Sequence, residues 1–165
     1  MRLAGKTALV TGGGSGFGAG IARKFIAEGA QVVIADINLA AAEAISEKLG
    51  TSTYAAHVDV ADLGSVKALA RQAEKDVGAV DIVINNAGVT HLPTPLDEVS
   101  EEDFDRVFSV NCKSVYLTAK TFVPAMKARG AGAILNIASG GTATQPELVQ
   151  QLERLDEHGD QNHGG

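Results

Sequence analysis

The sequence predicts an α/β fold in three layers, in which helices cover both faces of a doubly wound parallel sheet. Short apolar runs rich in strand-forming residues alternate along the chain with longer segments whose apolar residues recur at helical spacing. The short runs are mostly apolar, which is typical of parallel strands buried on both faces. Because crossovers between parallel strands are right-handed, we expect the strand order 3-2-1-4-5, with any ligand at the carboxyl ends of the strands.

Each expected strand is followed by a turn signal and then by a helical pattern. The expected strands cover residues 7–10, 31–35, 53–58, 80–84 and 133–138. The expected helices cover residues 16–28, 39–49, 62–77 (or a start at 65), a short stretch through 104–108, and 112–128. Asn38 and Gly50 are favourable residues for the two ends of the second helix. Residues 100–103 have the pattern of a capping box ahead of the fourth.

Composition and charge exclude several classes of protein. The chain has 165 residues, of which 45% are hydrophobic and 21% charged, as in ordinary globular proteins. Its net charge of −6 disfavours nucleic-acid binding. The single cysteine cannot form an internal disulfide. No apolar run approaches the ~20 residues that span a bilayer, and the first residues do not resemble a signal peptide, so we expect a cytoplasmic protein without membrane contact.

The composition changes after about residue 140. Four of the six glutamines fall after position 144. Residues 146–155 can form one short helix with Leu148, Leu152 and Leu155 on one side, and a frayed tail is expected from residue 158 onward. We therefore expect a nucleotide-binding domain over residues 1–140 and a divergent short helix with a disordered tail over 141–165. The change also suggests a C-terminal truncation or an altered reading frame, a hypothesis that the nucleotide sequence would test.

A glycine-rich segment, residues 11–18, lies between the first strand and the first helix. Glycines at such a junction let the backbone approach a diphosphate, and the helix N-terminus supplies N–H donors. A flexible turn is the alternative, but Asp36 ends the second strand, where a carboxylate accepts ribose hydroxyls and repels a 2′-phosphate. Neither Ser15 nor Ile37 is basic. The segment therefore predicts dinucleotide binding, with NAD favoured over NADP. A P-loop is excluded, because no Gly-Lys-Ser/Thr follows the glycines.

Further motifs follow this loop in a familiar order. The spacing Gly12-x-x-x-Gly16-x-Gly18 resembles that of the classical short-chain dehydrogenase/reductase family. Residues 85–88 (Asn-Asn-Ala-Gly) resemble its NNAG motif, and residues 59–60 (Asp-Val) resemble the pair that holds the adenine ring. The resemblance covers about residues 3–140. It implies a Rossmann-type fold and an NAD(P)-dependent oxidoreductase acting on a small alcohol or carbonyl compound.

The resemblance also implies particular site residues. The implied cofactor-binding residues are Gly12, Ser15, Gly16, Phe17, Gly18, Asp36, Ile37, Asp59, Val60, Asn86, Ala87 and Gly88. Asn111 and Ser139 fall where the family has its catalytic asparagine and serine, and no metal site is expected. Purely structural roles stay open as alternatives. Asp59 could cap a turn, and Asn111 could cap the long helix that follows it. Asn86 could satisfy backbone groups at the end of a strand. The family is usually dimeric or tetrameric, which implies a homo-oligomer through the helices after Ser100 and Asn111.

One part of the family's catalytic group is missing from the expected region. The family base is a Tyr in a Tyr-x-x-x-Lys motif after the serine, where the lysine lowers the phenol pKa from ~10. Residues 140–165 contain no Tyr and no Lys. Tyr116 and Lys120 have this spacing but precede Ser139, and packing in the core or at an interface is expected for Tyr116. The expected function is thus an impaired oxidoreductase. The alternatives are an NAD-binding module without turnover and a partner subunit that needs no cofactor.

Overall fold

The computed structural model describes residues 1–138, so Ser139 and the short helix and tail expected over 141–165 lie outside the described residues. The described part contains one parallel sheet of five strands in the order β3-β2-β1-β4-β5, as predicted. The strands are β1 (Thr7–Thr11), β2 (Gln31–Asp36), β3 (Thr53–His57), β4 (Ile82–Asn85) and β5 (Ala133–Asn136). The predicted doubly wound fold is therefore confirmed.

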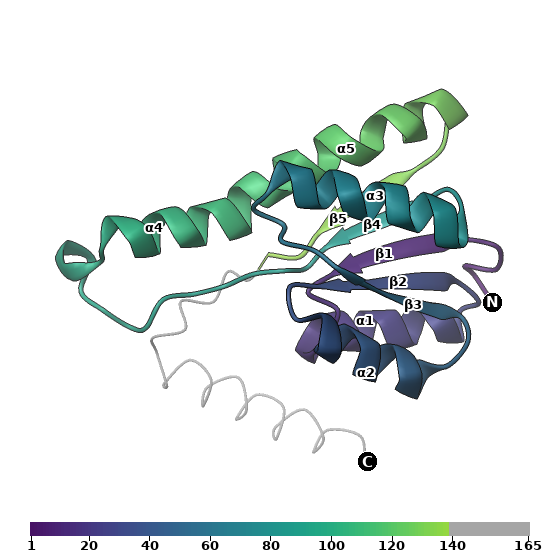
Figure 1. Ribbon diagram of the computed structural model, residues 1–165, viewed down its shortest axis with the longest axis horizontal. Coiled ribbons are helices and arrows are strands. Elements are labelled where there is room, and N and C mark those ends of the chain that lie inside the picture. The colour runs from purple at the N-terminus through teal and green to yellow at the C-terminus, as the bar shows by residue number, and fades with distance from the viewer. Residues whose placement is uncertain (139–165) are drawn as a thin grey trace, which may run out of the picture.

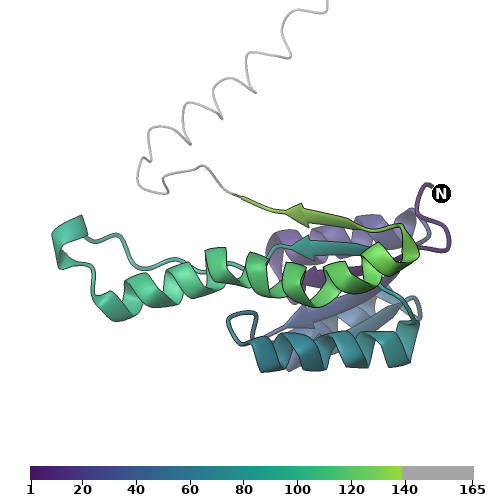
Figure 2. The same cartoon turned by 90° about the horizontal axis from the view of Figure 1, so that it is seen from above.

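Helices cover both faces of the sheet (Figures 1 and 2). On one face lie α1 (Gly16–Ala27) and α2 (Leu39–Leu49), and on the other lie α3 (Leu63–Val77) and α5 (Ser114–Arg129). A short 3-10 turn, Leu96–Glu98, precedes α4 (Glu101–Phe108), which extends away from the sheet. Among residues 1–138, no helix has the length and apolar character needed to cross a membrane.

Two hydrophobic clusters form the core, one on each side of the sheet. Successive strand side chains point to opposite faces, so neighbouring residues enter different clusters. Leu9 and Val33 pack toward α3 and α5, whereas Val10 and Ile34 pack toward α1 and α2. Because both faces are covered, the middle positions of the central strands are apolar, which is the pattern that predicted them.

Side-chain caps fix the starts of three helices. The Asn38 side chain accepts a hydrogen bond from the Ala41 N–H at the start of α2, at 3.2 Å. The Ser100 hydroxyl accepts one from the Asp103 N–H at the start of α4. At α3 the cap is Asp62, which accepts from the Ser65 N–H at 2.6 Å. Of the two starts that the sequence left open for this helix, the earlier one is therefore correct.

The expected separation between the fourth and fifth helices is wrong. A π-helical segment, Ser109–Lys113, joins α4 directly to α5, so the chain is helical without a break from Glu101 to Arg129. The α-helix α5 consequently begins at Ser114 rather than at Cys112. A single π turn inserts one extra residue into a helix, and such turns are frequent at functional sites.

An ion-pair cluster ties the first residues of the chain to the end of α1. The Glu28 carboxylate lies 2.9 Å from the Lys24 ammonium and 3.2 Å from the Arg2 guanidinium. The hydrogen bond from Lys24, followed by those from Arg2, lowers the pKa of Glu28 from 4.5 to about 2.

This cluster predicts a specific loss of stability in acid. Because the pKa of Glu28 is depressed in the folded state, its contribution is present above pH 4.5 and is lost as the pH falls toward about 2. Glu28→Gln should therefore lower the melting temperature at neutral pH, and the difference from the parent should shrink between pH 4.5 and 2. Thermal unfolding followed by circular dichroism measures this difference. A difference that stays constant over this pH range would contradict the assignment.

Candidate functional site

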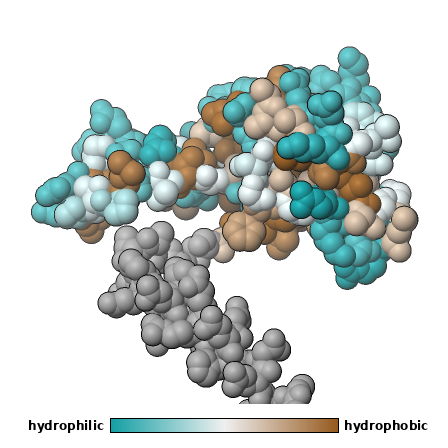
Figure 3. Space-filling model, turned by 90° about the horizontal axis from the view of Figure 1, so that it is seen from below, coloured by the Kyte–Doolittle hydropathy of each residue, from teal (hydrophilic) through white to brown (hydrophobic). Residues whose placement is uncertain are grey.

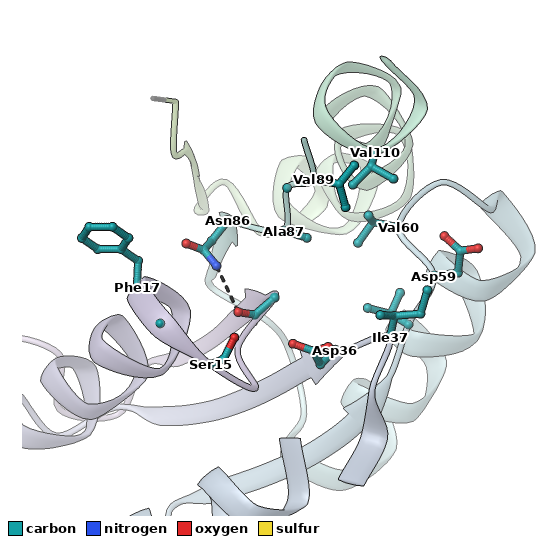
Figure 4. Close-up of a pocket in the computed structure, with 14 residues that line it drawn as sticks. Ser15, Phe17, Asp36, Ile37, Asp59, Val60, Asn86, Ala87, Val89 and Val110 are labelled. Atoms are coloured by element: carbon teal, nitrogen blue, oxygen red, sulfur yellow. Dashed lines mark hydrogen bonds between the residues drawn. The ribbon is translucent and has the colours of Figure 1, made fainter. Parts of the chain in front are cut away.

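A cavity of about 390 Å³ opens at the carboxyl edge of the sheet, where β1 lies between β2 and β4. The strand order reverses direction at this point, which is where doubly wound sheets bind ligands. The lining residues are Gly12, Ser15, Gly16, Phe17, Asp36, Ile37, Val58, Asp59, Val60, Asn86, Ala87, Gly88, Val89 and Val110. Figure 4 shows Ser15 and Asp36 on one side and Val60, Val89 and Val110 on the other. Of the expected cofactor-binding residues, Gly18 alone does not line the cavity.

Two glycines of the loop are required by close backbone contacts. Gly12 has a φ of +63°, and a Cβ there would lie 2.8 Å from the Cα of Ala87. Gly18 lies beneath the loop, where a Cβ would collide with the carbonyl oxygen of Gly12. Gly18 thus lets the first turn of α1 approach the loop, although it does not face the cavity.

The first turn of α1 has the chemistry of an anion site. Ser15 is the N-cap residue, and its hydroxyl makes no capping hydrogen bond within the described chain. The first turn carries no acidic side chain. Gly16 and Phe17, at the start of the helix, both line the cavity. The N–H groups and the positive end of the helix dipole therefore favour a diphosphate at this position.

The Asp36 carboxylate is held in a fixed orientation at the end of β2. One of its oxygens accepts a hydrogen bond from the Gly14 N–H at 2.9 Å, and the other accepts from the Asn38 N–H at 2.9 Å. A carboxylate oxygen has two lone pairs, so each of these oxygens can still accept a hydroxyl. The carboxylate lines the cavity and is suited to a sugar diol.

A hydrogen-bond network joins the glycine loop to the end of β4. The buried Thr11 hydroxyl donates to the Ile84 carbonyl and accepts from the N–H groups of Asn86 and Ala87 at 3.1 Å each. The Asn86 side-chain amide donates to the carbonyls of Thr11 and Gly12 at 3.0 and 3.1 Å, and Figure 4 shows one of these bonds. Asn86 thus satisfies backbone groups and also lines the cavity. The role of Thr11 was missed, although its position just before the glycines is a usable signal.

Apolar side chains form the wall next to Asp59. Ile37 is 67% exposed and Val60 is buried, and both line the cavity. The Asp59 side chain accepts a hydrogen bond from the Ala61 N–H, so the expected turn cap is present beside the cavity. Val58, Val89 and Val110 also line the cavity, although the sequence analysis did not predict them as site residues. Each of them is the sequence neighbour of a residue that was predicted.

Asn111 lies in the π-helical segment and clamps the loop that follows β4. Its side-chain oxygen accepts from the Val89 N–H at 2.9 Å, and its amide group donates to the Val89 carbonyl at 2.8 Å. The alternative that Asn111 caps the long helix is therefore wrong. Because Val89 lines the cavity, Asn111 positions one of its walls.

The clamp predicts a local change in amide hydrogen exchange. In Asn111→Ala the Val89 N–H loses its acceptor, and a hydrogen bond contributes ~1 kcal/mol, so exchange at Val89 should accelerate about fivefold. Two-dimensional NMR of the exchanging amides measures this rate. Buried amides of β1 serve as the internal control, because their ladder partners are unchanged. Unaltered exchange at Val89 would show that the side chain does not hold the loop in solution.

The Tyr116 and Lys120 side chains form a pair on the outer face of α5. The Lys120 ammonium donates to the Tyr116 phenol oxygen at 3.0 Å, and this hydrogen bond raises the pKa of Lys120. Tyr116 is 58% exposed, so of the two expected placements the core is wrong, and the interface stays a prediction. Neither side chain lines the cavity.

Comparison with known proteins supports what the cavity indicates. The short chain dehydrogenase family matches residues 6–150. The chain is 39% identical over 140 residues to galactitol 2-dehydrogenase of Agrobacterium fabrum, covering 84% of this chain and 54% of the relative. It is 40% identical over 142 residues to D-threitol dehydrogenase of Mycolicibacterium smegmatis, with the same coverage of 84% and 54%. The chain therefore spans about half the length of these relatives.

A solved structure shares the fold. The 3-ketoacyl-(acyl-carrier-protein) reductase from Brucella melitensis, complexed with NADH, superposes with a TM-score of 0.81 at 40% identity. The match covers 89% of this chain and 63% of that protein. The family match, the identities and the shared fold agree with the loop and cavity described above. The chain belongs to the short-chain dehydrogenase/reductase family and carries its NAD(P)-binding fold.

Proposed function

We propose that this chain binds NAD in the cavity at the carboxyl edge of the sheet and acts as an NAD-dependent oxidoreductase on a small alcohol or carbonyl compound. The observation that carries the proposal is the Asp36 carboxylate, oriented by two backbone N–H groups at the switch point of the sheet. A carboxylate there favours the free ribose diol of NAD and repels the 2′-phosphate of NADP. The NADH complex of the Brucella melitensis reductase supports a nicotinamide cofactor.

The cavity offers a suitable group for each part of NAD. Asp36 would hold the adenosine ribose, and Ile37 and Val60 would flank the adenine ring. The loop from Gly12 to Phe17 would hold the diphosphate, because its glycines leave the backbone open and α1 supplies N–H donors. Val58 and Asp59 would lie beside the adenine ring, and Asn86, Ala87, Gly88, Val89 and Val110 would hold the nicotinamide half.

The catalytic group is incomplete in these 165 residues. When bound, the cofactor accepts or supplies the hydride. We propose that Ser139 holds the substrate oxygen and that Asn111 positions the wall formed by Val89. No Tyr or Lys follows Ser139 to take the hydroxyl proton, and a positioned base contributes ~10²–10⁴-fold. Turnover by this polypeptide should therefore be feeble, which favours an NAD-binding module as the second candidate function.

The proposal includes association of two copies through α4 and α5. Phe104 and Phe108 on α4 are 61% and 55% exposed, and their rings stack with centroids 6.1 Å apart. Tyr116 adds a further exposed aromatic side chain on α5. Aromatic side chains of this kind are enriched in protein interfaces. A cytoplasmic location completes the proposal, because a single cysteine suits a reducing compartment.

A titration combined with a turnover assay tests the proposed function. The 165-residue polypeptide is titrated with NADH by fluorescence and then incubated with NAD and a panel of small polyols. Binding with slow oxidation supports the oxidoreductase, and binding without oxidation supports the module. Failure to bind either redox form of the cofactor would overturn both and leave a cofactor-free partner subunit.

A further inference from the structure

The helix α4, residues 101–108, forms an arm that stands apart from the sheet. Figures 1 and 3 show the arm as a narrow projection beyond the body of the described chain. None of its residues is buried. The arm continues through the π-helical segment into α5, whose Leu117, Phe122 and Met126 are buried in the core. The arm is therefore held mainly through its own helix.

Arg106 joins this arm to the loop that follows β4. Its Nη2 atom donates to the Thr90 carbonyl at 3.2 Å and to the Asp103 carboxylate at 3.1 Å. Asp103 lies one turn earlier on the same helix, so this ion pair orients the guanidinium toward the loop. Within residues 1–138, the bond to Thr90 is the one hydrogen bond from an α4 side chain to a residue outside the helix.

Asn111 fastens the same loop one residue earlier, through its two hydrogen bonds to Val89. In a plain α-helix, two residues five positions apart point ~140° away from each other around the axis. The π-helical segment Ser109–Lys113 reduces this angle, because a π turn joins residues five positions apart. The π turn therefore explains how Arg106 and Asn111 both reach this loop.

The two contacts hold successive peptide groups of the loop. Asn111 accepts from the Val89 N–H and donates to the Val89 carbonyl, and Arg106 donates to the Thr90 carbonyl. Val89 lines the cavity, whereas Arg106 does not. A loss of the Arg106 contact would therefore reach the cavity only through the loop and the position of Val89.

We propose that Arg106 is a positioning residue for the nicotinamide end of the cavity and that it acts through the Val89–Thr90 loop. The proposal rests on the proposed function, in which Val89 helps to hold the nicotinamide half of NAD. The adenosine half would lie against Asp36 and Ile37, at the end of β2, which the loop does not include. Arg106 should therefore affect one half of the cofactor and not the other.

Titration of the 165-residue chain with NADH and with ADP separates the two halves, because ADP carries the adenosine and the diphosphate but no nicotinamide. Arg106→Ala should lower the affinity for NADH about three- to tenfold, as expected for the loss of a charge-assisted hydrogen bond. Its affinity for ADP should equal that of the parent. Loss of a positive charge near the cavity would instead weaken both ligands, since both carry the diphosphate. Calorimetry measures the two affinities.

Arg129→Ala is the matched control for the same chemistry on the same helical rod. The Arg129 guanidinium also donates to a backbone carbonyl, that of Val80, at 2.8 Å. Val80 precedes β4, so this contact lies at the amino edge of the sheet, and neither residue lines the cavity. The control variant should bind NADH and ADP as the parent does.

A double variant tests whether Arg106 acts through the loop. In Asn111→Ala the loop has already lost one fastening, so adding Arg106→Ala should lower the NADH affinity by less than it does in the parent. Losses that multiply in the double variant would show that Arg106 acts by another route and would overturn the proposal.

Amide exchange at Val89 gives a reading without any cofactor. Arg106→Ala should accelerate this exchange although Asn111 is unaltered, and Arg129→Ala should not. Unaltered exchange at Val89, or equal losses of NADH and ADP affinity in Arg106→Ala, would overturn the inference and leave the proposed function standing. If the parent chain binds neither NADH nor ADP, the proposed function fails, and the inference fails with it.

Discussion

Asp36→Ala should lower the affinity of the chain for NADH by about 10- to 100-fold, because hydrogen bonds to a charged group contribute ~1.5–3 kcal/mol. The affinity for NADPH should rise in the same variant, since the carboxylate no longer faces the 2′-phosphate. The change therefore reverses the cofactor preference and does not merely weaken binding. Fluorescence titration with the two reduced cofactors measures the ratio directly.

Asp36→Asn removes the negative charge of this side chain and keeps its size. Its amide oxygen can still accept the Gly14 N–H, which the parent carboxylate accepts at 2.9 Å, so the hydrogen bond to the loop is kept. The bond from the Asn38 N–H is lost, because the amide NH2 group cannot accept it. The repulsion of the 2′-phosphate is lost, and the NADH to NADPH preference should fall toward one. Asp62→Ala, which removes the α3 cap outside the cavity, should destabilise the protein without changing this ratio. An unchanged ratio in both Asp36 variants would contradict the role given to the carboxylate.

Gly18→Ala should abolish detectable NADH binding and lower the free energy of unfolding. The added Cβ collides with the Gly12 carbonyl oxygen and lies 2.7 Å from the Asn86 side-chain nitrogen, so the loop and the end of β4 must move apart. Overpacking of this kind costs ~1–3 kcal/mol. Because the displaced carbonyl belongs to the loop proposed to hold the diphosphate, binding should fail even in molecules that remain folded. Urea unfolding and NADH titration measure the two effects.

Gly20→Ala is the matched control on the same helix. A Cβ at Gly20 meets no atom within 4 Å, and alanine is favoured over glycine in a helix by about 1 kcal/mol. This variant should be at least as stable as the parent and should retain NADH binding. If Gly18→Ala loses NADH binding and Gly20→Ala keeps it, the loss comes from the contact of Gly18 with the loop and not from a general effect on α1. Equal losses in both variants would show that the contact with Gly12 is not the cause.

Local signals in the sequence predicted most of the fold. Asn38 and Ser100 cap the helices that they were expected to cap, because a cap joins a side chain to an N–H three residues away. The apolar strands predicted a buried parallel sheet, and the handedness of crossovers then left few strand orders. The continuity of α4 with α5 was missed because a π turn has no strong residue signature.

The candidate site was predicted in its composition but not in its internal contacts. The motifs identified the residues of the loop and of the strand ends, because these adjoin the glycines and Asp36 in a recognisable order. They did not predict the Thr11 hydroxyl at the centre of the network or the clamp of Asn111 on Val89. These contacts join residues 22 to 76 positions apart, and no spacing rule along one chain specifies such pairs.

By itself the sequence determined the alternation of strands and helices, the glycine loop and the acidic end of β2, because periodicity, caps and turns act over a few neighbouring residues. The tertiary structure alone decided which of these residues share the cavity and that Tyr116 is exposed. Exposure and contact depend on how distant segments pack, and packing is a property of the assembled layers rather than of any one segment.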